Sequence, residues 1–245
     1  MSKNPKIKEN KAKKKPVDLL IFIFMTLVLL SFGVLLYKSF DKVKTSNYLK
    51  TIKKLSQNNN PQDYKLYLTK TLEKIKNKKL KASVYSKIGD INLSLKNYQE
   101  AIPAYKNSYK LDPTNFEVCA NLGLALGEIG KYAEAINYLN ISKKLNPEIP
   151  EIYINLGVQL ANQKKIPEAI ANLKKAIELN SKHYRAYTNL SAIYFRIKDY
   201  ENTRKTINLA TQNGANASPI FKEILQQQLT ELNKLENAII KLPNK

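Results

Sequence analysis

Three asparagines, Asn121, Asn155 and Asn189, stand thirty-four residues apart and are well suited to one shared chemical task. A side-chain amide has both a donor and an acceptor, so it can bond the N–H and the C=O of a passing backbone. A row of such amides can therefore hold an extended chain without reading its side chains. Lys87 stands at the equivalent position one period earlier, so the row does not extend to that unit.

Residues for acid–base, nucleophilic or metal chemistry are scarce. The chain has one histidine, His183, and one cysteine, Cys119. A metal site needs several His, Cys or carboxylate ligands, and a Ser-His-Asp arrangement would depend on that one histidine. A lone cysteine forms no intramolecular disulfide, and its place among apolar residues indicates a buried thiol. We therefore expect no catalytic residue, no metal, no cofactor and no enzymatic activity.

Two columns of small residues indicate the elements that position the asparagines. The first column consists of Gly89, Gly123, Gly157 and Ser191, and the second of Ala101, Ala135, Ala169 and Thr203. Two helices approach closely only where side chains are small, and larger apolar residues at helical spacing surround these positions. Each unit is therefore predicted to be a pair of crossing helices. One pair cannot bury its own apolar face, so several pairs must stack.

The period and the two columns resemble the tetratricopeptide repeat. The resemblance implies an all-α fold, an α-solenoid of helix-turn-helix units at residues 82–115, 116–149, 150–183 and 184–217. It also places Asn121, Asn155 and Asn189 on the concave face. The groove residues expected beside them are Leu124, Val158, Phe195, Arg185 and Arg196.

Two interpretations of the asparagine row remain open. In some tetratricopeptide solenoids such a row holds a bound peptide, and the alternative is that asparagine is simply the common family residue at this position. A basic clamp for acidic chaperone tails would need Lys and Asn where Ser86 and Asp90 stand in the first unit. That activity is therefore not carried over.

The positive charge is concentrated near the N-terminus. The net charge is +21, with 20 Lys and 5 acids in residues 1–81 against 21 Lys plus Arg and 15 acids in residues 82–245. Residues 1–18 predict a basic disordered tail. Lysines on both sides of an apolar segment favour anionic lipid headgroups over nucleic acid as their partner.

Residues 19–37 form a run of nineteen residues without a charge. As a helix this run is about 28 Å long, close to the hydrocarbon thickness of a bilayer. We interpret it as a transmembrane signal anchor, and the alternative is a buried helix of a soluble protein. A short Lys-rich tail resists translocation, whereas long domains translocate largely regardless of charge. A single-pass membrane protein with a cytoplasmic tail and extracytoplasmic repeats is therefore preferred to the inverted orientation.

Residues 38–81 predict a Lys-rich linker with a degenerate helix pair, and residues 218–245 predict a C-terminal capping helix. The alternative for the last helix is a dimerising coiled coil, so the oligomeric state stays open. The preferred function is a membrane-anchored scaffold for a protein or peptide ligand, in cell-envelope assembly or protein translocation. The alternatives are a cytoplasm-facing receptor for client or chaperone proteins and, third, nucleic-acid binding. The last is opposed by a net charge of only +6 over residues 82–245.

Overall fold

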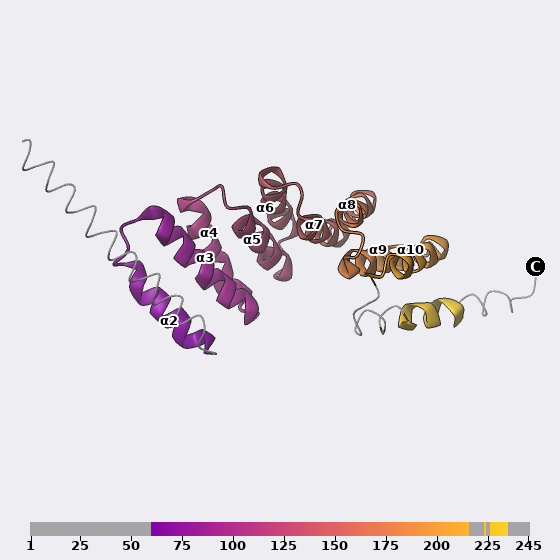
Figure 1. The fold of residues 1–245 in the computed structure, drawn as a ribbon, viewed down its shortest axis with the longest axis horizontal. Helices are drawn as coiled ribbons and strands as arrows, with labels where there is room; N and C mark the ends of the chain where they lie inside the picture. The colour runs from indigo at the N-terminus through magenta and orange to yellow at the C-terminus, as the bar shows by residue number, and fades with distance from the viewer. Residues whose placement is uncertain (1–59, 216–222, 224–225, 235–245) are drawn as a thin grey trace, which may run out of the picture. The chain divides into compact units, whose positions relative to one another are not determined.

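The computed structural model describes residues 60–215, 223 and 226–234, and within these ranges the chain is helical and has no strand (Figure 1). The predicted all-α class is confirmed there. The helices are α2 (Pro61–Leu72), α3 (Lys78–Ser94), α4 (Tyr98–Leu111), α5 (Phe116–Glu128), α6 (Tyr132–Leu145), α7 (Pro150–Asn162), α8 (Ile166–Leu179), α9 (Tyr184–Arg196) and α10 (Tyr200–Gln212). Residues 226–234 are also helical.

The residues predicted to anchor the chain in a membrane lie largely outside the described ranges. None of the helices in the described ranges is long and apolar enough to cross a bilayer. The predicted tail 1–18, the predicted transmembrane segment 19–37 and the start of the predicted linker, residues 38–59, lie outside the described ranges. The later part of that linker contains α2 and the first turn of α3.

Consecutive helices pair as hairpins, α3 with α4, α5 with α6, α7 with α8 and α9 with α10. Each hairpin packs against the next one, and the first helices also contact one another, α3 with α5, α5 with α7 and α7 with α9 (Figure 1). The predicted solenoid of helix-turn-helix units is confirmed. The first helices therefore share one face of the stack.

The small residues lie where the two helices of a hairpin meet. A Cβ atom on Gly123 would stand 2.6 Å from Leu139 Cγ, and one on Gly157 would stand 2.6 Å from Leu173 Cγ. Ala135 and Ala169 of the second column are fully buried. Leucine side chains of the second helix thus fill the space beside Gly123 and Gly157, and they leave no room for a larger residue at these positions of the first helix.

Polar side chains fix the helix ends. The amide oxygen of Asn77 accepts from the N–H of Leu80 at 2.9 Å, so α3 begins at Lys78, ahead of its predicted start at Ala82. The amide oxygen of Asn115 caps α5 in the same way, at 3.1 Å from the N–H of Val118. A side-chain cap of this kind satisfies one of the free N–H groups of a first turn.

The turn inside each hairpin contains a residue with positive φ. These residues are Lys96, Gly130, Lys164 and Lys198, with φ between 60° and 79°. They stand one repeat period apart. Only Gly130 is the residue type that adopts this conformation without strain.

Cys119 lies in α5 and is fully buried. Burial raises the pKa of its thiol to about 11. A thiol with a raised pKa is mostly protonated at neutral pH and reacts slowly. The predicted buried thiol is confirmed.

The described part of the C-terminal segment packs on the last hairpin. Leu229 contacts the buried cluster of Tyr187, Ile207, Ala210 and Ala215, and Leu232 is fully buried. The Ser191 hydroxyl lies 2.9 Å from Gln228 Oε1. The full extent of the predicted capping helix, residues 218–245, stays a prediction.

Candidate functional site

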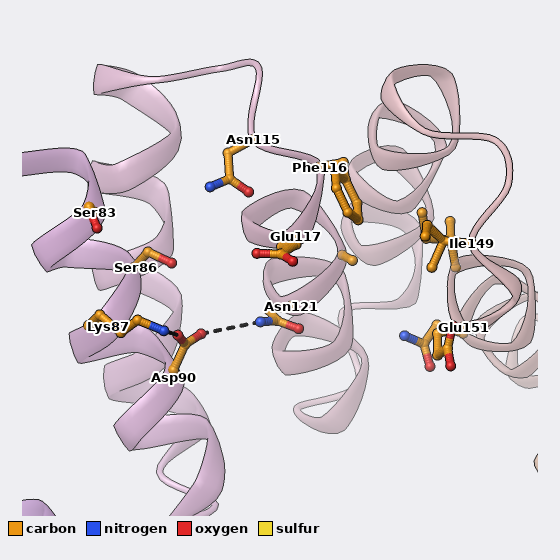
Figure 2. A pocket seen from close by; sticks show the side chains of 13 residues that line it. Ser83, Ser86, Lys87, Asp90, Asn115, Phe116, Glu117, Asn121, Ile149 and Glu151 are labelled. Carbon is orange, nitrogen blue, oxygen red and sulfur yellow. Dashed lines mark hydrogen bonds and ion pairs between the residues drawn. The ribbon is translucent and has the colours of Figure 1, made fainter. Parts of the chain in front are cut away.

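A cavity with a volume of about 450 Å³ lies along the first helices α3, α5 and α7. Asn121 and Asn155 line it together with charged residues of all three helices (Figure 2). Phe116, Ile149 and Ile152 provide an apolar part of the wall. The cavity therefore combines backbone-binding amides with space for apolar side chains.

Asp90 organises the α3 wall of this cavity. Its Oδ1 accepts from the Tyr105 hydroxyl at 2.9 Å and from Asn121 Nδ2 at 3.3 Å, and its Oδ2 accepts from Lys87 Nζ at 3.1 Å. Figure 2 shows the bonds to Asn121 and Lys87. Tyr105 is fully buried in α4, and its burial, followed by the charge of Asp90, raises the pKa of its hydroxyl. The phenol therefore stays a donor to the carboxylate.

These bonds fix the orientation of the Asn121 amide. An ionised carboxylate only accepts hydrogen bonds, so the amide nitrogen of Asn121 must face Asp90. The amide oxygen of Asn121 is then left for a ligand N–H. Asn155 and Asn189 are half-buried and bond to no other described residue through their side chains. Three residues that look equivalent in the sequence are thus one restrained amide and two unrestrained ones.

A second cavity of about 220 Å³ lies between α7 and α9. It is lined by Val158, Asn189 and Arg196, all predicted groove residues, and by four neighbours, Ala161, Asn162, Ala192 and Ile193. Arg196 Nη2 is 3.5 Å from the carbonyl oxygen of Ala161, near the end of α7. The asparagine row therefore continues from the first cavity into the second.

The other predicted groove residues, Leu124, Arg185 and Phe195, line neither cavity. The Phe195 ring contacts the ring of Tyr200 edge to face, with centroids 5.8 Å apart. Phe195 is therefore engaged inside its own hairpin. Sequence reasoning placed it in the groove from its helical register alone, which does not reveal such a contact.

Sequence reasoning also omitted several lining residues, among them Phe116 and Ile149. Both stand at or just before the start of a first helix, where the repeat pattern is weakest. Asn115 and Ile149, which both line the cavity, occupy the same position of consecutive units, so the turns between units indicate this position but not Phe116.

Besides Asp90, two carboxylates line the first cavity, those of Glu117 in α5 and Glu151 in α7 (Figure 2). Glu151 Oε1 is 3.1 Å from His183 Nε2, and Glu117 pairs with no cation of the described residues. Among the described residues that line this cavity, Lys87 is the one Lys or Arg, and it pairs with Asp90. In the described ranges no three His, Cys or carboxylate side chains come together as a metal site.

Comparison with known proteins gives consistent results for the fold. Residues 92–153 and residues 159–218 match two family profiles, each described as Tetratricopeptide repeat. No curated protein matches the sequence significantly.

Among solved structures, the MamA RS-1 ArsTM double mutant is similar with a TM-score of 0.64 and 18% identity, over 72% of this chain and 97% of that one. YrrB, described as a TPR protein with an unusual peptide-binding site, has a TM-score of 0.60 and 20% identity, over 74% of this chain and 90% of that one. PilF of Pseudomonas aeruginosa has a TM-score of 0.59 and 20% identity, over 80% of this chain and 93% of that one. At these identities the similarity concerns the fold.

Proposed function

We propose that this chain, which belongs to the tetratricopeptide repeat family, is a non-enzymatic scaffold that binds an extended segment of another protein. The segment lies along the first helices, across both cavities. The observation that carries this proposal is the asparagine row itself, because Asn121 and Asn155 line the first cavity and Asn189 lines the second. A site of this kind on a similar solenoid is consistent with the peptide-binding site described for YrrB.

The cavity walls suggest how the segment is held. The amides of Asn155 and Asn189 each offer a donor and an acceptor to the ligand backbone, and Asn121 offers its oxygen. Phe116 and Ile149 in the first cavity and Val158 in the second contact apolar side chains of the segment. Backbone bonds provide affinity and the apolar pockets provide selectivity, as in other recognition of extended peptides.

Site-specific photo-cross-linking in intact cells tests this proposal. A photoreactive amino acid at Ala120, which lines the first cavity, is expected to capture a discrete partner. The same amino acid at Asn137, an exposed residue of α6, is expected to capture none. Identical products from both positions would contradict binding in the cavity.

The asparagine row is tested by combining that cross-linker with Asn155→Ala and Asn189→Ala. We expect the affinity reported by the product at Ala120 to fall about thirtyfold, because two amide bonds of about 1 kcal/mol each are lost. Asn107→Ala with Asn137→Ala is the matched control, because both amides are exposed on second helices. An unchanged yield in the double cavity variant, with unchanged helicity, would remove the amides from the mechanism.

Membrane anchoring is a second part of the proposal and rests on sequence alone. Residues 19–37 are nineteen residues without a charge, followed by six Lys within residues 38–54. We expect the full-length chain to resist alkaline extraction from membranes and a variant lacking residues 1–37 to be released. Extraction of both chains alike would contradict the anchor.

Orientation separates the two functional settings. Extracytoplasmic repeats fit a role in cell-envelope assembly or protein translocation, whereas cytoplasmic repeats fit a receptor for client or chaperone proteins. A reporter that is active only in the cytoplasm, fused after Lys245, is expected to be inactive. An active reporter selects the receptor.

A further inference from the structure

The sign of charge changes along the groove at one helical position. The second residue is Glu117 in α5, Glu151 in α7 and Arg185 in α9. Both glutamates line the first cavity, and Arg185 occupies the same helical position beyond the residues that line the two cavities. On the last turn of α7 and α9, Asn162 and Arg196 line the second cavity. The first cavity therefore has acidic side chains on α5 and α7, whereas α9 has the basic residues Arg196, which lines the second cavity, and Arg185, which is exposed.

In the described part of the chain, no Lys or Arg pairs with Glu117 or Glu151. Glu117 pairs with no cation of the described residues, and the partner of Glu151 is the imidazole of His183. Lys87, which is the one Lys or Arg among the described residues that line the first cavity, is balanced by Asp90 at 3.1 Å. The chain has a net charge of +21 and 41 Lys plus Arg. Carboxylates at a cavity that pair with no Lys or Arg of the described residues are complementary to positive charges on a ligand.

Helix stabilisation does not account for this pattern. Acidic residues in a first turn stabilise a helix through its dipole, and the second helices have them too, at Glu100, Glu134, Glu168 and Glu201. Arg185 has the opposite sign in the first turn of α9, where a positive charge is unfavourable. The helix dipole therefore explains Glu117 and Glu151, but it does not explain the positive charge of Arg185 at the same helical position.

We infer that the groove selects a segment of a partner protein with basic residues against α5 and α7 and an acidic residue against α9. This inference rests on the proposed function and names the charge class of its ligand. Adjacent packed helices lie about 10 Å apart, and an extended chain rises about 3.3 Å per residue. Contacts with successive first helices are therefore about three residues apart in the ligand. The segment has two basic residues with that spacing and an acidic residue about three positions further along, at one end only.

A random twelve-residue peptide library displayed on phage, selected against the purified full-length chain in detergent, tests the charge class directly. We expect enriched peptides to have the basic pair and the acidic residue at the spacing given above. Selection against Asn155→Ala with Asn189→Ala reports whether the enriched peptides use the groove at all.

Charge reversal supplies the decisive comparison. Glu117→Lys with Glu151→Lys is expected to replace the basic pair of the enriched peptides by acidic residues and to weaken binding of the original peptides about tenfold, since two attractive pairs become repulsive. Arg185→Glu is expected to change only the residue at the other end. Glu168→Lys with Glu201→Lys is the matched control, because both acids occupy first turns outside the groove. Helicity of every variant is measured alongside.

The outcomes separate the two ideas. The charge inference would be overturned if the enriched peptides needed the asparagines but showed no charge bias. It would also be overturned if the charge-reversed variants selected peptides with the same bias. Either result would leave the proposed scaffold function standing. No enrichment above that of the asparagine variant would overturn the scaffold itself, and the charge inference with it.

Discussion

The middle hairpins and the last hairpin achieve the same close helix crossing with different residues. In α5 and α7 the contact residue is Gly123 or Gly157, and a leucine of the second helix fills the space above it. In α9 it is Ser191, which is fully buried, and its hydroxyl reaches Gln228 in the C-terminal segment. A glycine allows the closest approach, whereas a serine at the same position also bonds to a segment that follows the hairpin.

The largest expected effect comes from adding one methyl group to a middle hairpin. Gly157→Ala places a Cβ atom 2.6 Å from Leu173 Cγ and 3.2 Å from the carbonyl oxygen of Ala169. We expect a loss of about 3 kcal/mol in the free energy of unfolding, because the helices must move apart. Urea denaturation followed by circular dichroism measures it.

The matched variant in the last hairpin is Ser191→Gly, which removes side-chain atoms at the same position. This variant loses the contact with Gln228 and creates no clash. Its loss in the free energy of unfolding is therefore expected to be clearly smaller than that of Gly157→Ala. If Gly157→Ala were tolerated as well as Ser191→Gly, the space above Gly157 would not be as tightly filled by Leu173 as described.

A second and smaller effect concerns the hydroxyl of Ser191. Ser191→Ala keeps the Cβ atom but leaves Gln228 Oε1 without this donor. A loss of about 1 kcal/mol is expected, concentrated in the C-terminal segment. Amide hydrogen exchange should accelerate in residues 226–234 and stay unchanged in α5 and α6. Unchanged exchange in residues 226–234 would show that Leu229 and Leu232 alone hold the segment.

A third test compares the hairpin turns. Gly130 in the α5–α6 turn and Lys198 in the α9–α10 turn have φ values of 79° and 62°. Lys198→Gly is expected to stabilise the chain by about 0.5 kcal/mol and Gly130→Lys to destabilise it by a similar amount, because side chains strain this conformation. Thermal melts of the two variants should shift in opposite directions, and a shift of the same sign would contradict a local backbone origin.

The smallest expected effect is the response to acid. The N-cap residues of α6 and α8, Lys131 and Lys165, make no side-chain cap, whereas Asp199 caps α10 by accepting from the N–H of Asn202 at 3.1 Å. The side chain and the N–H of Asn202 lower the pKa of Asp199. The contribution of Asp199 to stability is therefore present above the unfolded pKa of aspartate, about 3.9, and is lost as the pH falls through the lowered folded value.

Exchange measured at neutral pH and near pH 3 is expected to show faster opening of α10 in acid than of α6 or α8. Asp199→Asn is the control, because asparagine also caps a helix and does not titrate in this range. An equal response to acid in the variant would assign the effect to another group.

The sequence predicted the fold well because its periodic signal comes from packing. Gly123, Gly157 and the small residues of the second column are required by the crossing, so their spacing predicts the hairpins. The start of α3 was harder to predict from the sequence, because it depends on a single side-chain hydrogen bond to Asn77.

The candidate site was only partly predictable. The register of Asn121, Asn155 and Asn189 follows from the repeat, but the bond from Asn121 to Asp90 joins residues of different units and has no periodic signature. The same holds for Phe195, whose contact with Tyr200 engages it within its own hairpin. The repeat indicates which positions face the groove, whereas the individual contacts decide which of those side chains remain available.

Because Cys119 is buried, the reactivity of its thiol reports how often the structure opens locally. Its thiol is the one sulfhydryl of the sequence and is fully buried in α5. An alkylating reagent therefore reaches it only when the packing around α5 opens. The rate of modification in the unaltered protein then measures how often the centre of the stack opens, and a ligand that clamps α5 against α7 should slow that rate.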